Sequence, residues 1–96
     1  MKQDITMELT ADNNFSLLNR IINILNRRRV RIKKLIAHEN EDDFRRGGCV
    51  MLLYTTHDMA EKVKVQLEKL IEVESVSYQE GNAMYMEMSE RIVDVD

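Results

Sequence analysis

Three side chains in this sequence are strong candidates for a nucleophile, a general base or a metal ligand: His38, Cys49 and His57. Cys49 lies in the apolar run "CVMLLYTT", where a buried and unreactive thiol is expected. His38 follows an apolar segment, His57 directly precedes a helix start, and no spacing among the three matches a zinc ligand set. No Ser-His-Asp arrangement can be built around them. The sequence therefore predicts a protein that is not an enzyme, with no catalytic residue and no cofactor.

An acidic segment at residues 39–43 could coordinate a hard cation. It lacks the glycine and the distant bidentate glutamate of a calcium-binding loop, so we expect a solvated loop and no metal. One cysteine allows no internal disulfide and no Cys-rich zinc site, and is typical of a reducing compartment. The N-terminal "MKQDITMELT" alternates apolar and polar residues, which predicts neither a signal peptide nor a membrane span. We expect a cytoplasmic protein with no membrane partner.

The run "NRRRVRIKKL" at residues 26–35 could bind nucleic acid. The whole chain, however, carries 14 basic against 17 acidic residues and a net charge of −3, whereas nucleic-acid-binding domains usually have a strong positive balance. RNA-recognition modules also place stacking aromatic residues on their third strand. The corresponding stretch here, "RGGCVMLLY", has Gly, Val, Met and Leu at those positions. We therefore expect no nucleic-acid partner.

The periodicity of apolar residues predicts four strands and two helices. Period-two alternation marks strands, and apolar residues at i, i+3, i+4 and i+7 mark a helix with one buried face. A break in the alternation at Lys33 and Lys34 suggests a bulge, and Asp58 with Glu61 resembles a capping box. The expected order is strand 3–11, helix 13–28, strand 30–37, hairpin loop 38–48, strand 49–56, helix 57–71 and strand 73–79.

This order predicts an α+β protein with the ferredoxin-like βαββαβ fold, a four-stranded antiparallel sheet with two helices on one face. The nearly continuous apolar run at residues 49–56 is typical of a central strand. The Met-rich segment at residues 80–96 is expected to be a C-terminal tail or a short extra strand. The predicted domain thus spans residues 3–79.

Two phrases carry a resemblance to a known family. The segment "ITMELTADNNFSLLNRIINILNRRRVRIKKLIAHENEDD" and the phrase "VQLEKLIEVESVSY" resemble the small regulatory subunit of acetolactate synthase (acetohydroxyacid synthase). The resemblance covers residues 4–79 and is closest to the short form with a single ACT domain. It implies a non-catalytic subunit that pairs through its sheet as a homodimer. It also implies binding to the thiamine-diphosphate-dependent catalytic subunit in valine, leucine and isoleucine biosynthesis.

The resemblance further implies a branched-chain amino-acid effector at the dimer interface, near the turn before the first helix. Free N–H groups at a helix start can hold a carboxylate, and apolar neighbours can hold an aliphatic side chain. The family's turn Asn corresponds to Asn13, but its Pro-Gly corresponds to Phe15-Ser16, and its later Gly and Asn correspond to Arg29 and Arg31. A free-standing amino-acid-sensing ACT module with an unrelated partner is the alternative. The candidate effector-binding residues are Asn13, Asn14, Phe15, Ser16, Arg29 and Arg31.

Overall fold

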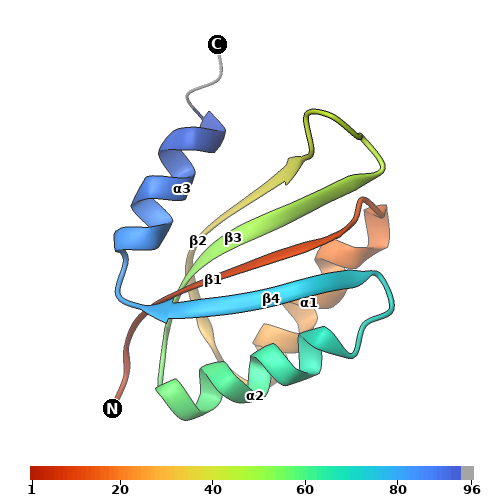
Figure 1. Cartoon of the computed structure of the whole chain (residues 1–96). Coiled ribbons are helices and arrows are strands. Elements are labelled where there is room, and N and C mark those ends of the chain that lie inside the picture. The colour runs from red at the N-terminus through yellow and green to blue at the C-terminus, as the bar shows by residue number, and fades with distance from the viewer. Residues whose placement is uncertain (94–96) are drawn as a thin grey trace.

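The computed structural model describes residues 1–93, apart from the side chains of Phe15 and Val93. Four strands form one antiparallel sheet in the order β2-β3-β1-β4. Helices α1 and α2 lie on one face of it and α3 on the other (Figure 1). The predicted ferredoxin-like βαββαβ fold is therefore confirmed. The elements are β1 (Gln3–Asp12), α1 (Phe15–Arg27), β2 (Arg31–Glu39), β3 (Arg46–Thr55), α2 (His57–Glu68), β4 (Val73–Glu80) and α3 (Ala83–Val93).

The main core lies between the sheet and the two helices α1 and α2. Alternate residues of β1 and β3 point into it, because successive side chains of a strand face opposite sides of the sheet. On α1 and α2 the buried residues recur every three or four positions, as an amphipathic helix requires. The fully buried large side chains of this core include Ile5, Met7, Leu25, Met51, Leu53 and Leu67.

Strand β3 is paired on both sides, by β1 and β2, which confirms the prediction of a central strand. The bulge predicted at Lys33 and Lys34 is also confirmed, since the pairing of β2 with β3 shifts register between Ile32 and Lys34. The predicted hairpin loop is shorter than expected. Gly47 and Gly48 belong to β3, which begins at Arg46, because strand pairing continues through both glycines.

The start and the end of α2 differ from the prediction. The N-cap is Thr56, whose hydroxyl accepts from the Met59 N–H at 3.1 Å, rather than Asp58 in a capping box. The helix ends at Glu68, so Ile71 is 97% exposed in the following turn instead of extending the apolar stripe. A Thr side chain at the end of a strand satisfies the same free N–H groups that Asp58 was expected to cap.

The segment expected to be a tail or a short strand contains helix α3, so that prediction is wrong for Ala83–Val93. Tyr85, Met88 and Ile92 lie at i, i+3 and i+7 and pack together on the sheet face opposite α1 and α2. The alternation of methionines at residues 84–88 fits a strand as well as a helix, and this tertiary contact decides between them. Residues 94–96, which the same prediction included, lie outside the described residues.

Candidate functional site

A cavity of about 310 Å³ opens between the first turns of α1 and the adjoining ends of β1, β2 and β3. Its walls are mostly apolar and include four polar residues. That combination suits a small ligand with an aliphatic part and a charged part. The apolar lining comprises Leu9, Ala11, Leu17, Leu18, Ile21, Ala37 and Cys49, and the polar lining comprises Asn13, Asn14, His38 and Glu39.

The turn before α1 supplies Asn13 and Asn14 in two different roles. Asn14 is the N-cap of α1, and its Oδ1 accepts from the Ser16 N–H at 2.9 Å and from the Ser16 hydroxyl at 2.9 Å. Asn13 donates from Nδ2 to the Phe44 carbonyl at 2.9 Å, which ties the turn to the loop between β2 and β3. The first turn of α1 contains no acidic residue. The start of α1 therefore borders the cavity with no acidic side chain in its own first turn, which suits an anion.

Two glycines of β3 form another part of the cavity wall. A Cβ at Gly47 would meet the His38 carbonyl oxygen at 2.6 Å, and one at Gly48 would meet the Leu9 carbonyl oxygen at 2.4 Å. Both distances are too short for any other residue unless the strands move apart. The glycines therefore let β3 lie close to both neighbouring strands at the cavity. The sequence showed the glycine pair, but the expectation of a loop hid this role.

Cys49 lines the cavity as a neutral thiol. Its residue is 3% exposed, and burial raises the pKa of its thiol to about 12. The prediction of a buried cysteine is therefore confirmed. Glu39 contributes an exposed carboxylate from the end of β2, directly across from Gly47. Sequence reasoning placed Glu39 in an acidic loop, and only the strand pairing brings it to the cavity.

The six residues predicted for effector binding do not gather in one place within a single chain. Asn13 and Asn14 line the cavity, and Ser16 lies beside them through its bonds to Asn14. Phe15 begins α1, but its side chain lies outside the described part of the structure. Arg29 and Arg31 follow the other end of α1, a 13-residue helix about 20 Å long.

Arg29 has a role in the backbone that explains why a glycine suits its position. It adopts a left-handed conformation with φ of 56° immediately after α1. The Arg29 N–H donates to the Asn26 carbonyl at 3.0 Å, and the Val30 N–H donates to the Leu25 carbonyl at 3.0 Å. These bonds close the helix end in the manner of a Schellman motif, where glycine is preferred. The helix C-terminus is therefore sufficient reason for a glycine at this position.

The basic run that contains Arg31 is divided among separate contacts. The Arg31 guanidinium lies 5.9 Å from the centre of the Tyr54 ring. Arg28 donates to the Gln66 side chain at 3.0 Å, and Lys33 donates to Asp4 at 3.0 Å. The run thus links α1 to α2 and β2 to β1, in addition to carrying charge on the surface.

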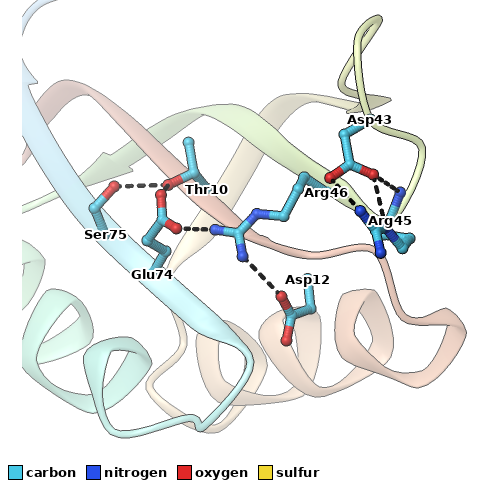
Figure 2. Close-up of polar contacts among 7 residues, drawn as sticks. All are labelled: Thr10, Asp12, Asp43, Arg45, Arg46, Glu74 and Ser75. Atoms are coloured by element: carbon cyan, nitrogen blue, oxygen red, sulfur yellow. Dashed lines mark hydrogen bonds and ion pairs between the residues drawn. The ribbon is translucent and has the colours of Figure 1, made fainter.

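Ion pairs fix the strand ends next to the cavity. Figure 2 shows Arg46 of β3 between two carboxylates, with Asp12 at 3.0 Å and Glu74 on β4. In the adjoining loop a hydrogen bond from the Arg45 side chain, at 3.0 Å, lowers the pKa of Asp43. Arg46 therefore spans β3, β1 and β4 at the end of the sheet where the cavity opens.

A second ion pair connects α1 to the turn before β4. Arg20 donates to both carboxylate oxygens of Glu72, and this hydrogen bonding lowers the pKa of Glu72 while it raises that of Arg20. The Asp12 N–H donates to the Glu72 carbonyl at 2.9 Å, which joins the same turn to the end of β1. Together these contacts hold the start of α1 against the sheet.

Within residues 1–93, no group of three His, Cys, Asp or Glu side chains could hold a metal ion. In the same residues, no helix is both long and apolar enough to cross a membrane.

Comparison with solved structures identifies the fold. The chain is similar to the ACT domain of a GTP pyrophosphokinase from Chlorobium tepidum, with a TM-score of 0.70 and 11% identity, covering 82% of this chain and 100% of that one. It is similar to an acetolactate synthase small subunit from Thermotoga maritima, with a TM-score of 0.70 and 20% identity, covering 79% of this chain and 47% of that one. It is also similar to the C-terminal domain of the MgtC protein from Mycobacterium tuberculosis, with a TM-score of 0.69 and 12% identity, covering 84% and 89%. No family model and no curated protein matches the sequence.

Proposed function

We propose that this chain is a non-catalytic regulatory module that senses a small aliphatic amino acid in the cavity beside α1. The observation that carries the proposal is the composition of this cavity, in which an apolar wall lies next to the N-terminus of α1 and an exposed carboxylate. An amino acid presents the three matching groups: a carboxylate, an ammonium and a side chain. Its proposed location is cytoplasmic.

Each part of the ligand has a proposed counterpart. The ligand carboxylate lies at the N-terminus of α1, where the Asn13–Asn14 turn orients the backbone N–H groups. The aliphatic side chain contacts the apolar wall that includes Leu17 and Ile21. The ammonium lies toward Glu39, whose charge distinguishes an amino acid from a simple carboxylic acid.

We propose that the chain forms a homodimer paired through β2. Strand β2 is an edge of the sheet, so its outer hydrogen-bonding groups are available to a second copy. It begins with the basic residues Arg31, Lys33 and Lys34 and ends with the acidic Glu39. Antiparallel pairing of two copies places the basic start of each strand beside the acidic end of the other, which favours this orientation. In that dimer the Arg31 end of β2 in one chain lies next to the Glu39 end of β2 in its partner, with the two side chains on opposite faces of the sheet.

We infer that the regulated enzyme is acetolactate synthase, with this chain as its regulatory subunit in branched-chain amino-acid biosynthesis. Support comes from the phrases shared with that family and from the similar fold of the Thermotoga maritima small subunit at 20% identity. The alternative is a free-standing amino-acid sensor acting on an unrelated partner. That alternative is favoured by the equal TM-score for the ACT domain of a GTP pyrophosphokinase.

Reconstitution with the acetolactate synthase catalytic subunit of the same organism tests this assignment. We expect the chain to co-purify with the catalytic subunit, to raise its activity, and to make that activity respond to valine, leucine or isoleucine. An intact, folded chain that neither binds the catalytic subunit nor changes its activity contradicts the acetolactate synthase assignment. If such a chain still binds an amino acid, the sensor with an unrelated partner is supported instead.

A further inference from the structure

Helix α3 forms a hydrophobic cluster separate from the main core. Tyr85, which is 4% exposed, packs with Val50 and Leu52 of β3, and Met88 and Ile92 pack against the same cluster. Among the side chains that the structure describes, none of α3 belongs to the main core between the sheet and α1 and α2. The βαββαβ unit therefore buries its principal core without the help of this helix.

The sheet face under α3 is divided into an apolar half and a polar half. Val50 and Leu52 on β3, with Ile36 on β2, form the apolar half, and α3 covers it. The other half presents Glu8, Thr10, Ser75 and Ser77 from β1 and β4. The apolar stripe of α3 thus shields the apolar half of this sheet face from solvent.

A second cavity, of about 490 Å³, opens between the last turns of α3 and the ends of the strands. It is lined by four carboxylates, from Glu39, Glu41, Asp42 and Glu74, and by the two arginines Arg46 and Arg91. Arg46 is already paired with Asp12 and Glu74. Arg91 is paired with Glu87 on α3 itself, and it borders this cavity without an ion pair to the strands among the described residues.

Only a short connection joins α3 to the sheet. Gly81 follows β4 in a left-handed conformation with φ of 86°, and a Cβ there would meet nothing within 4 Å. On the sheet, the Thr6 hydroxyl donates to the Gly81 carbonyl at 2.9 Å and accepts from the Tyr85 N–H at 3.3 Å. The position of α3 therefore depends on the conformation of Gly81, the two hydrogen bonds of the Thr6 hydroxyl and one small hydrophobic cluster.

We propose that α3 is an exchangeable helix, which can dock on the same face of a second copy of this chain as it does on its own. The hydrophobic and polar contacts described above join α3 to the βαββαβ unit. A second copy offers the same apolar half-face and the same Thr6 hydroxyl. Only the backbone at Gly81 has to change, and left-handed and extended conformations are both open to glycine. Exchange of an identical element across a short hinge is a recognised route to pairing of protein chains.

The test uses two full-length chains, both with Cys49→Ser, one carrying Leu52→Cys and the other Met88→Cys. The chains are mixed, and a short bis-maleimide is added. A mixed cross-linked adduct forms only when α3 of one chain lies on β3 of the other. Pairing of two copies through β2 does not produce this adduct. In such a dimer β3 is separated from the second copy by the edge strand β2, and each copy's α3 remains on its own sheet. One chain with both cysteines is the control, and it must cross-link internally.

The hinge provides a matched pair of variants for the same experiment. Gly81→Val disfavours the left-handed conformation of the closed hinge, whereas Gly81→Asn tolerates it. We expect several-fold more mixed adduct from the Val hinge than from the Asn hinge. Two results overturn the proposal: no mixed adduct with either hinge while the control cross-links internally, or equal amounts of adduct with both. The result is independent of amino-acid binding and of the acetolactate synthase assignment.

Discussion

Arg29 is the residue whose local conformation conflicts most with its type. A non-glycine residue in the left-handed region carries a steric cost between its Cβ and the backbone, and only the helix-closing bonds hold it there. We expect Arg29→Gly to stabilise the fold by about 1 kcal/mol, because glycine removes this cost at a helix end. Chemical denaturation monitored by circular dichroism measures the difference.

Arg29→Ala is the matched control for this prediction, because it removes the charge and keeps the Cβ. Its stability should stay close to that of the unchanged chain. Equal stabilisation by Ala and Gly would mean that the charge of Arg29, and not its backbone conformation, carries the cost. The helix end would then not explain why the resembled family has glycine at the position of Arg29.

At the scale of single residues, the sequence predicted what depends on local pattern. The Asn13–Asn14 turn, the buried Cys49 and the bulge at Lys33 all follow from residue type and spacing. Glu39 and the glycine pair at the cavity were missed, because their roles arise from strands that are distant in sequence. Arg31 was expected at the effector site from a family resemblance, and in a single chain it lies at the opposite end of α1.

Among the elements, α3 is the one that local pattern could not identify. The methionines of this segment alternate with a period of two, which fits a strand. Tyr85, Met88 and Ile92, however, have helical spacing and pack against apolar residues of β2 and β3. The other elements were predicted because the helices have one apolar stripe each, β1, β2 and β4 alternate apolar and polar residues, and β3 is a continuous apolar run. The sequence of α3 is compatible with both strand and helix periodicity, and packing against the sheet favours the helix.

Thr6 is fully buried and links β1 to α3 through its hydroxyl. Replacement by Val keeps the shape of the side chain and leaves the Gly81 carbonyl and the Tyr85 N–H without this partner. Each lost hydrogen bond costs about 1 kcal/mol. We expect Thr6→Val to accelerate amide hydrogen exchange in α3 while exchange in β1 and β3 changes little. Uniform acceleration across the chain would show that α3 is not a separately opening unit.

The ion pair between Arg20 and Glu72 predicts how the elements respond to acid. Hydrogen bonding from Arg20 lowers the folded-state pKa of Glu72 below its unfolded value. The pair therefore stabilises the fold above the ordinary pKa of a glutamate, and this contribution is lost as the pH falls through the folded-state value. Glu72→Gln should lower stability at neutral pH and narrow the difference from the unchanged chain in acid. A stability difference that stays constant with pH would contradict this role.

At the scale of the whole molecule, the proposed dimer depends on the charge pattern of β2. Arg31→Glu puts an acidic residue at the strand end that meets the acidic Glu39 end of β2 in the second copy, and should shift the protein toward monomer. Adding Glu39→Arg in the same chain restores opposite charges and should restore the dimer. Sedimentation velocity measures both states. A single variant that dimerises as well as the unchanged chain, or a double variant that stays monomeric, would exclude pairing through this edge.

The central claim is that the cavity beside α1 binds a small aliphatic amino acid. Isothermal titration of the full chain with valine, leucine and isoleucine tests it most directly, with Ala37→Phe as a variant that fills the cavity from an exposed edge position. We expect saturable binding of at least one of the three amino acids, with a Kd on the order of micromolar to millimolar, and loss of that binding in Ala37→Phe. Absence of heat with all three amino acids, or equal binding to the filled variant, would contradict the assignment of this cavity.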